Sequence, residues 1–470
     1  MNVLFCSSEV FPFAATGGLA DVCGSLPPAL EKVGVHVAVM MPHYKNIKRK
    51  NFPIEKINNA VSKTKLGGTV DVYLVENRAF FERDGLYSEP AGDYSDNLER
   101  FHFFCRESLE LMKQLNLKPD VIHCHDWQTA LIPVYLKTIL HDDSFYRHIK
   151  SFLTIHNLAY QGIFHKSEYF KLGLPETYFG MDGFEFYGKV NLLKAGILLS
   201  DMVTTVSPRY AKEIQTKEFG CGLEGVLHKR GRHIHGVLNG IDYNRWNPET
   251  DPYITQPYCA KTVNDKAINK QSLQKECGFT VDADIPLLGF VARLSAQKGI
   301  DLLVQVIDDL IKENCQLVLL GEGEKKYQDI LRNLSRRYPD KISIHLAFDE
   351  SRAHRIYAGS DIFLMPSHYE PCGLSQMISL CYGTIPVVFK TGGLADTIVP
   401  FNPADSQGNG FIFTRYERKD FMKSLETALK IYRQKKDFKR IIKNAFSCNF
   451  SWEKAAKEYQ HLYKECLQSG

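Results

Sequence analysis

Six residues with the chemistry of an anion-binding loop occur twice in the chain. Thr16-Gly17-Gly18-Leu19-Ala20-Asp21 is repeated letter for letter at Thr391-Gly392-Gly393-Leu394-Ala395-Asp396. Paired glycines let backbone N–H groups approach an anion closely, above all where a helix begins. The preceding residues differ, because Lys390 stands before the second copy and Ala15 before the first. The repeat predicts two loops that bind phosphate or sugar, of which only the second has an adjacent cation.

Two further cations stand where a ligand could meet them in the second half of the chain. Arg293 and Lys298 follow the apolar run from Leu287 to Ala292, which predicts a buried strand. Arginine offers a planar fork and lysine a compact charge, and both bind phosphate strongly, although they could also be solvated surface cations. With Lys390 expected at the same sheet edge, three cations would repel one another without an anion. This grouping favours a diphosphate site.

A carboxylate and an amide lie in the next loop, Tyr369-Glu370-Pro371-Cys372-Gly373-Leu374-Ser375-Gln376. Glu370 could accept hydrogen bonds from sugar hydroxyls, or it could stabilise the first turn of the helix that follows. Gln376 could equally face a ligand or be a buried helix residue. The loop alone leaves both interpretations open.

Polar side chains end two predicted strands in the first half. Asp126 follows the strand that contains Val121-Ile122-His123, and His156 follows Ser151 to Ile155. Since ligands bind at the carboxyl ends of parallel strands, both side chains are expected to face a cleft. Each could instead be structural, and Asn239 could be a simple turn residue.

The run His123-Cys124-His125-Asp126 has residue types that bind zinc, but alternate side chains of a strand point to opposite faces. We therefore expect no metal site. The twelve cysteines form no Cys-x-x-Cys pair, which indicates reduced thiols in a cytoplasmic protein.

Composition narrows the class of protein. The chain has 470 residues, 44% of them hydrophobic, with a formal net charge of +4. This length predicts two or three globular domains, and the weak, scattered charge argues against nucleic acid as a partner. No apolar run is long enough to span a membrane. Glu9 interrupts the only candidate for a signal peptide.

Strand and helix patterns alternate along the chain, which indicates an α/β protein with parallel sheets. A strand over Asn2 to Cys6, a helix over Leu19 to Lys32 and a strand over Val35 to Met41 form the first unit of this kind. Asn, Gly, Asp and Pro accumulate between Asn239 and Pro252, and a new series of strands then begins. The sequence predicts two doubly wound domains with a cleft between them, at 1–245 and 246–450, and a packing helix within 451–470.

Together these segments resemble the bacterial glycogen synthase and plant starch synthase family. The resemblance covers nearly the whole chain, and its motifs occur in the family's order: Ser8-Glu9-Val10, Thr16 to Asp21, His125-Asp126-Trp127, Thr154 to Gly162, Asn239-Gly240-Ile241-Asp242, Arg293 to Gly299, Glu370 to Leu374 and Lys390 to Asp396.

The resemblance implies a GT-B glycosyltransferase, with two Rossmann-like domains that face a central cleft and a C-terminal helix that packs back. Such an enzyme transfers glucose from ADP-glucose to the non-reducing end of an α-1,4-glucan in glycogen biosynthesis, with retention of configuration. It needs no metal or other cofactor. As the bond to ADP breaks, preorganised cations and N–H groups stabilise the charge on the leaving phosphate.

The resemblance also implies roles for individual residues. Arg293 and Lys298 would hold the donor phosphates, Glu370 the transferred glucose and His156 its 6-hydroxyl end, with Asp126 nearby. The other expected site residues are Asp21 near the reacting groups, Gly17, Gly18, Thr391, Gly392 and Gly393 along the donor, Phe348 against the adenine, and Asn239, Gln376 and Lys390 elsewhere in the cleft. A glycosidase-like mechanism would need two carboxylates flanking the bond. Only Glu370 is evident, which fits a mechanism in which the leaving phosphate takes the acceptor's proton.

Ala15 departs from the family pattern, because relatives carry lysine there beside the donor. A lost charge-assisted hydrogen bond costs about 1.5–3 kcal/mol, or roughly ten- to a few-hundred-fold in rate. The sequence therefore predicts a weakened synthase or one with another nucleotide-glucose donor, and a glucan-binding protein without turnover is the alternative from another class. A phosphorylase is disfavoured because no pyridoxal-phosphate lysine segment is present, and a sucrose-type synthase because of the repeated hexapeptide.

Overall fold

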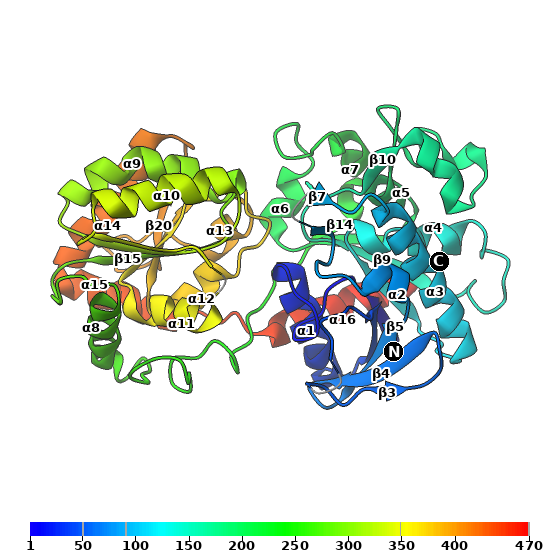
Figure 1. The fold of residues 1–470 in the computed structure, drawn as a ribbon, viewed down its shortest axis with the longest axis horizontal. Coiled ribbons are helices and arrows are strands. Elements are labelled where there is room, and N and C mark those ends of the chain that lie inside the picture. The colour runs from blue at the N-terminus through cyan, green and yellow to red at the C-terminus, as the bar shows by residue number, and fades with distance from the viewer. Residues whose placement is uncertain (49–50, 90–91, 348, 469–470) are drawn as a thin grey trace. The chain divides into compact units, whose positions relative to one another are not determined.

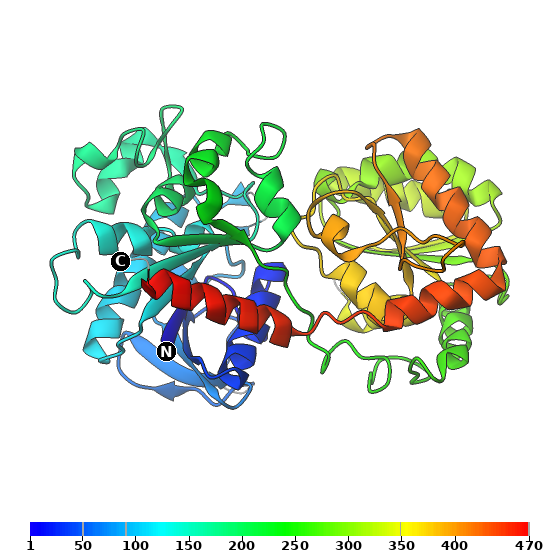
Figure 2. The ribbon, with the colours of Figure 1, turned by 180° about the vertical axis from the view of Figure 1, so that it is seen from behind.

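The computed structural model describes residues 1–48, 51–89, 92–347 and 349–468. The chain forms two compact units (Figures 1 and 2). The first unit contains residues 1–240 together with the C-terminal residues from Trp452 onward, and the second contains residues 241–451. Each unit has its own sheet, covered by helices on both faces.

The first unit is built on a nine-stranded sheet in the order β14-β13-β9-β8-β1-β2-β5-β4-β3. Its strands are β1 (Asn2–Cys6), β2 (His36–Pro42), β3 (Glu55–Lys56), β4 (Val61–Leu66), β5 (Val70–Val75), β8 (Val121–His125), β9 (Lys150–Ile155), β13 (Met202–Thr205) and β14 (Ile234–Gly236). All pairs from β14 to β5 are parallel, and β4 and β3 add an antiparallel edge. The central strands are buried along their length, as expected for a parallel sheet covered on both faces.

Helices and two small sheets complete this unit. The helices are α1 (Gly18–Lys32), α2 (Arg78–Phe81), α3 (Asn97–Gln114), α4 (Leu131–Lys137), α5 (Leu192–Leu199), α6 (Pro208–Glu213), α7 (Glu224–Arg230) and α16 (Trp452–Gln468). The small antiparallel sheets consist of β6 (Ser88–Glu89) with β7 (Gly92–Asp93), and of β10 (Ile163–His165), β12 (Lys189–Asn191) and β11 (Glu185–Phe186).

The second unit has six parallel strands in the order β17-β16-β15-β18-β19-β20. The strands are β15 (Leu287–Val291), β16 (Gln316–Leu320), β17 (Ile342–His345), β18 (Ile362–Met365), β19 (Ile385–Phe389) and β20 (Phe411–Phe413). The helices are α8 (Lys266–Glu276), α9 (Ile300–Lys312), α10 (Lys325–Arg337), α11 (Glu350–Gly359), α12 (Ser375–Cys381), α13 (Gly392–Thr397), α14 (Arg418–Arg433) and α15 (Lys435–Phe446). In Figure 1, α9 and α10 lie on one face of this sheet and α11 and α12 on the other.

Each sheet reverses its strand order at one point, and ligands bind at such points in doubly wound sheets. In the first unit the chain proceeds from β1 to β2 on one side and later places β8 on the other side of β1. In the second unit β15 is followed by β16 and β17, and β18 then pairs with the free side of β15. The loops after β1 and β8, and those after β15 and β18, are therefore the places to look for a site.

The chain passes between the units twice, along adjacent segments. The N–H of Ile241 donates to the carbonyl of Phe450 (2.8 Å), and Ile241 pairs with Ser451 in a parallel bridge. After the second crossing α16 packs on α1 and belongs to the first unit, where it crosses one face in Figure 2. The Tyr463 hydroxyl lies 2.7 Å from Nδ1 of His123, so the last helix contacts a central strand of the first sheet.

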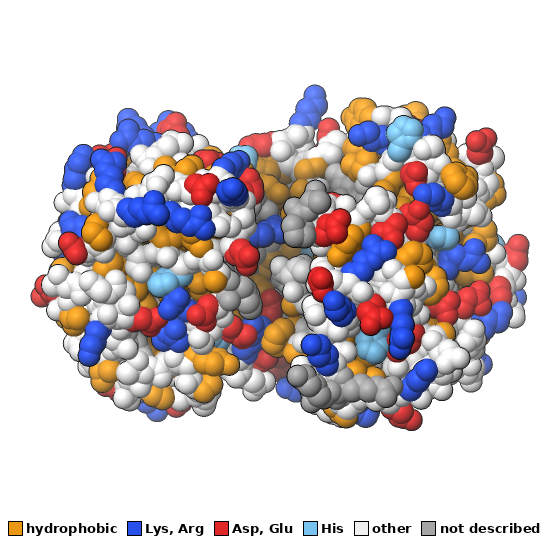
Figure 3. Space-filling view, viewed as in Figure 1, with side chains coloured by type: hydrophobic (Ala, Val, Ile, Leu, Met, Phe, Trp, Pro, Cys, Tyr) orange, Lys and Arg blue, Asp and Glu red, His pale blue; other side chains and the backbone are white. Residues whose placement is uncertain are grey.

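The visible surface of each unit mixes positive, negative and apolar side chains (Figure 3). This distribution agrees with the weak net charge. None of the helices in the described part of the chain is long and apolar enough to cross a membrane.

Candidate active site

An ion pair lies at the reversal point of the second unit. The ammonium of Lys298, which follows β15, donates to Oε2 of Glu370, which follows β18, at 2.6 Å. The Glu370 residue is buried, and the Lys298 side chain keeps 19% of its surface exposed. The sequence predicted both residues here but assigned them to different parts of the donor, whereas the structure joins them directly.

Backbone contacts hold the two loops of this ion pair together. The N–H of His368 donates to the carbonyl of Gln297 (2.9 Å), and the Gln297 amide donates to the carbonyl of Tyr369 (3.2 Å). Because neighbours of both charged residues are joined in this way, the two loops keep Lys298 and Glu370 close to each other. Arg293, in the same loop as Lys298, is exposed.

The second copy of the hexapeptide packs against the Glu370 loop. Gly392 has φ of +41°, and a Cβ there would lie 1.9 Å from the Glu370 carbonyl oxygen. The N–H of Gly393 donates to that same carbonyl (3.1 Å), and a Cβ on Gly393 would lie 2.0 Å from the carbonyl oxygen of Cys372. Thr391 is buried and Lys390 is exposed. Glycine is thus required here by the protein's own packing.

Gln376 braces the same loop from within α12. Its amide nitrogen donates to the carbonyls of Cys372 (3.1 Å) and Gly373 (3.0 Å) and lies 3.2 Å from Oγ1 of Thr397. Its Oε1 is buried without a hydrogen-bond partner among the described residues. Of the two interpretations open from sequence, the contacts favour a buried residue that supports the loop.

In the first unit a buried carboxylate holds the first copy of the hexapeptide. Glu9 follows β1, and its oxygens accept hydrogen bonds from the N–H (2.5 Å) and hydroxyl (2.7 Å) of Thr16, from the N–H of Gly17 (3.3 Å) and from the hydroxyl of Tyr87 (2.7 Å). Burial raises the pKa of Glu9, and these hydrogen bonds oppose the rise. Sequence reasoning missed this anchor, although an acidic residue between a strand and a glycine loop is a usable signal.

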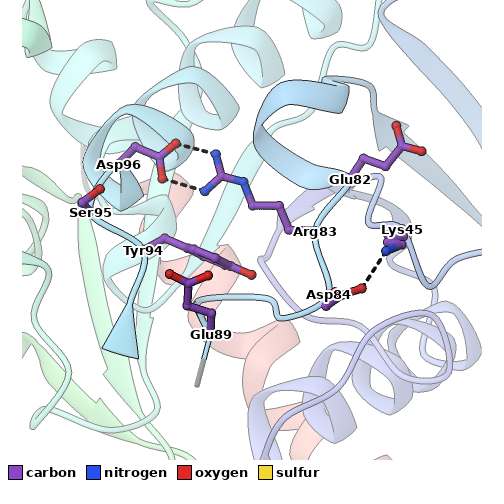
Figure 4. A pocket seen from close by; sticks show the side chains of 8 residues that line it. All are labelled: Lys45, Glu82, Arg83, Asp84, Glu89, Tyr94, Ser95 and Asp96. Atoms are coloured by element: carbon purple, nitrogen blue, oxygen red, sulfur yellow. Dashed lines mark hydrogen bonds and ion pairs between the residues drawn. The ribbon is translucent and has the colours of Figure 1, made fainter. Parts of the chain in front are cut away.

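The segment that carries Tyr87 is itself fixed by ion pairs, which line a polar pocket (Figure 4). Arg83 binds both carboxylate oxygens of Asp96 (2.7 and 2.6 Å), and Lys45 binds Asp84 (2.6 Å). Figure 4 shows the Arg83 fork aligned with the Asp96 carboxylate. These ion pairs tie down residues close in sequence to Tyr87, whose hydroxyl donates to Glu9.

The first glycine loop is open, in contrast to the second. Residues 15–18 are exposed, and Gly17 has an extended backbone with φ of −169°. A Cβ on Gly17 would meet no atom within 4 Å. The fold of this unit therefore does not require a bare backbone at Gly17, and Ala15 faces solvent on the same loop.

Asp126 lies at the end of β8 in a conformation that is rare for residues other than glycine. Its φ is +56°, and its Oδ1 accepts a hydrogen bond from the N–H of His156 (2.7 Å). Burial, together with a smaller contribution from the charge of Glu9, raises the pKa of Asp126 to about 7 despite this hydrogen bond. A carboxyl group with such a pKa can hold or release a proton near neutral pH, which suits an acid or base.

Three buried, neutral histidines lie in β8 or directly after β9. Nδ1 of His125 lies 2.9 Å from Nε2 of His156, so one ring donates to the other. Burial lowers the pKa of His156 to about 3 and those of His123 and His125 well below their usual range. His123 lies between the Tyr463 hydroxyl and Oγ1 of Thr154 (2.6 Å). Across the described ranges, no three His, Cys, Asp or Glu side chains are grouped so that they could hold a metal ion.

The remaining predicted residues have the following places. Asp21 lies in the first turn of α1, and Asn239 is buried with its Oδ1 unpartnered among the described residues. Phe348 lies outside the described residues, so its expected contact with adenine has no structural counterpart here. Taken unit by unit, the structure brings Asp126 and His156 together in the first unit, and Lys298, Glu370 and the second glycine loop together in the second.

Two family models match the chain, one in each unit. The starch synthase catalytic domain matches residues 2–229, and the glycosyl transferases group 1 domain matches residues 279–447. Both matches agree with the sites described above, since the first contains Glu9, Asp126 and His156 and the second contains Lys298 and Glu370.

Full-length relatives give the same assignment. The chain is 46% identical to a glycogen synthase of Desulforamulus reducens, over 100% of both chains, and 46% identical to one of Thermotoga maritima, over 99% of both. The catalytic domain of starch synthase IV from Arabidopsis thaliana, bound to ADP and acarbose, is 33% identical over 99% of both chains, with a TM-score of 0.92. A sucrose-phosphate synthase of Thermosynechococcus elongatus shares the fold, at 17% identity and a TM-score of 0.63. The chain is therefore a glycosyltransferase with the GT-B fold and belongs to the family of bacterial glycogen synthases and plant starch synthases.

Proposed function

We propose that the enzyme transfers glucose from ADP-glucose to the non-reducing end of an α-1,4-glucan, with retention of configuration. The observation that carries this proposal is the Lys298–Glu370 ion pair beside the second glycine loop, at the strand reversal of the second unit. A cation for phosphate and a carboxylate for sugar hydroxyls stand in contact there. The ADP and acarbose bound to the starch synthase IV relative support a nucleotide donor and a glucan acceptor.

The donor is proposed to bind on the second unit. One N–H of the Lys298 ammonium is taken by Glu370, and two remain for phosphate oxygens. As the bond between glucose and ADP breaks, Lys298 and Arg293 stabilise the negative charge that develops on the leaving phosphate. Glu370, held by Lys298, accepts hydrogen bonds from the hydroxyls of the transferred glucose.

The first unit is proposed to supply neutral groups to the sugar. His156 is uncharged near neutral pH, so it can donate or accept one hydrogen bond at the 6-hydroxyl without attracting a phosphate. Asp126 lies behind His156 and holds its backbone. The attacking acceptor hydroxyl passes its proton to the leaving phosphate, because Glu370 is already engaged in the ion pair.

Ala15 favours a second candidate function. The first glycine loop carries no cation in the position where the second copy has Lys390. A protein that binds glucan and nucleotide sugar but turns over slowly, or not at all, would have this loop. The retained Lys298–Glu370 pair favours the synthase. We further propose a cytoplasmic location, which the lack of a disulfide among the twelve cysteines, all of them within the described residues, supports.

The test is ADP release from ADP-glucose in the presence of glycogen, with UDP-glucose in parallel. We expect release with ADP-glucose and a faster rate from an Ala15→Lys variant. If UDP is released from UDP-glucose faster than ADP is released from ADP-glucose, the enzyme is still a glucosyltransferase, but its donor is UDP-glucose. If neither protein releases nucleotide from either donor and both bind glycogen, the chain is the glucan-binding protein without turnover.

A further inference from the structure

The most exposed large apolar side chains of the described residues lie in one stretch of the first unit. Met181, Tyr187 and Phe170 are 84%, 80% and 75% exposed, and no other large apolar side chain in the described ranges exceeds 56%. The stretch spans residues 160–191 and contains β10, β11 and β12. Figure 3 shows apolar side chains on the surface over this part of the unit. A segment with this much apolar exposure is a place to look for a binding surface.

One of these side chains occupies a strained position. The pairs Glu185 with Val190 and Phe186 with Lys189 leave a two-residue loop, Tyr187-Gly188, at the tip of the β11–β12 hairpin. Both loop residues have positive φ, +48° and +76°. Such loops favour Asn-Gly, because asparagine tolerates the left-handed region and a bulky residue does not. The hairpin therefore carries an aromatic side chain at a position where the backbone conformation would strain asparagine or glycine less.

The ring of Tyr187 is held in place although its surface is exposed. Its centroid lies 4.8 Å from that of Phe186, with the two planes at 78°. Both rings also approach Gly222, where an added Cβ would lie 2.9 Å from Cζ of Phe186 and 3.5 Å from Cε2 of Tyr187. A ring fixed by its edges loses little freedom when a ligand covers it.

Buried contacts connect this hairpin to the site residues of the same unit. Oε1 of Gln161 accepts a hydrogen bond from the Asn191 amide (2.6 Å), and the Gln161 amide donates to the carbonyl of Cys221 (3.1 Å). The neighbouring Gly162 packs so closely on Trp127 that a Cβ would lie 2.5 Å from its ring. The hairpin is thus anchored to the loop that follows His156 and to the residue after Asp126.

We propose that Tyr187 is a stacking platform for a glucose unit of the α-1,4-glucan, at a subsite separate from the point of transfer. This inference rests on the proposed function, which supplies an α-glucan as the acceptor. A pyranose ring presents an apolar C–H face, which packs on an aromatic ring, and a rim of hydroxyls that need polar partners. Asp182, which belongs to this stretch, forms an exposed ion pair with Lys229 (2.8 Å). These two side chains offer such polar partners to a glucan bound along the stretch.

The test replaces Tyr187 by residues that suit its backbone. Tyr187→Asn and Tyr187→Gly both remove the ring and tolerate positive φ, so the hairpin should keep or gain stability. We expect the affinity for glycogen, measured by native gel electrophoresis in glycogen-containing gels, to fall about 2- to 10-fold. The KM for glycogen should rise in parallel, while the KM for ADP-glucose stays unchanged.

Two control variants separate the ring from other effects. Tyr187→Phe keeps the ring and should bind glycogen within about twofold of the parent. Tyr253→Asn removes a 45% exposed tyrosine from the second unit and should leave glycogen binding unchanged. Parental affinity of Tyr187→Asn and Tyr187→Gly would overturn the proposal, as would a change of oligomeric state on size-exclusion chromatography, which would place the ring in an interface between copies.

The same experiments distinguish this proposal from the proposed function. If the parent binds glycogen through Tyr187 but releases no ADP, the proposed transferase activity is wrong and the proposed stacking role of Tyr187 is supported. If the parent turns over ADP-glucose and the Tyr187 variants bind glycogen like the parent, the platform fails and the transferase stands.

Discussion

The two copies of Thr-Gly-Gly-Leu-Ala-Asp have the same sequence but opposite structural environments. The second copy is buried, and both of its glycines pack on carbonyl oxygens of the Glu370 loop. In the first copy residues 16–18 are exposed, and Gly17 has open space where a Cβ would stand. The Glu9 carboxylate accepts hydrogen bonds from this loop. Identical letters therefore serve two purposes. The second loop needs glycine to fold, whereas the packing of the first loop makes no such demand at Gly17, as we expect if Gly17 contacts the proposed donor.

The largest expected effect would come from filling the second loop. Gly392→Ala places a Cβ 1.9 Å from a carbonyl oxygen at a positive φ. We expect a loss of roughly 2–5 kcal/mol in the unfolding free energy of the second unit, seen as a fall in Tm of roughly 10 °C. Thermal unfolding followed by circular dichroism measures it.

Gly17→Ala is the matched control for that variant. Because nothing lies within 4 Å of the new methyl group, its Tm should stay at the parental value. The KM for ADP-glucose should rise if the bare backbone of Gly17 contacts the donor. Equal losses of Tm in the two variants would contradict the difference drawn between the loops.

The next effect concerns the charges beside each loop. Lys298→Met should lower kcat/KM for ADP-glucose by about 10²–10³, since it removes a preorganised cation from the leaving phosphate and releases Glu370. A Glu370→Gln variant and the double variant complete a cycle measured by steady-state kinetics. Because the two side chains act as one unit, their effects should be strongly non-additive. Additive losses would show that the pair does not act in this way.

A smaller effect is expected from giving the first loop the cation that precedes the second. Ala15→Lys should raise kcat/KM for ADP-glucose by roughly 10- to 100-fold, the value of one charge-assisted hydrogen bond. Tm should not change, because position 15 is exposed. Ala15→Met has similar length without charge, and an equal gain from it would show that charge is not the cause.

The last effect is a pH dependence confined to the first unit, and it is small within any one pH unit. Burial raises the pKa of Asp126 to about 7 in the folded protein, so between about pH 4 and 7 the folded state binds a proton that the unfolded state has lost. This contribution falls as pH rises, by about 1.4 kcal/mol per pH unit at most. The buried histidines act in the opposite direction, because their lowered pKa values cost stability as pH falls below about 6.5.

Comparing the parent with Asp126→Asn cancels the histidine contribution. Urea unfolding at several pH values between 4.5 and 7.5 should show the parent losing stability relative to the variant as pH rises. A constant difference across this range would mean that Asp126 stays ionised in the folded protein.

Much of the fold was predictable from local pattern. The strand over Asn2 to Cys6 has the predicted bounds, and the helix predicted over Leu19 to Lys32 begins one residue earlier. The predicted GT-B architecture and family membership are confirmed by the matches to both halves and to full-length relatives. These features were predictable because alternating apolar runs and motifs consist of residues that are close together in the sequence.

What sequence could not supply depends on distant contacts. The Lys298–Glu370 pair joins residues 72 positions apart, and the Glu9–Tyr87 contact joins residues 78 apart. The shifted pKa of Asp126 arises from burial, which no motif states. The roles predicted for the individual site residues remain predictions. The two glycine loops illustrate the reason, because their identical sequences do not indicate which loop is buried in the folded protein.

The return of α16 to the first unit has a consequence for the order in which the chain folds. The second unit is continuous, from Ile241 to Ser451, so its core is complete before the last helix leaves the ribosome. Most of the first unit precedes the second in the chain, but it lacks α16, with the Tyr463 partner of His123, until the second unit has been made. Domains made first usually fold first. Here the unit whose residues come first in the chain must wait, because the contact of Tyr463 with His123 in β8 cannot form until the whole second unit has been synthesised.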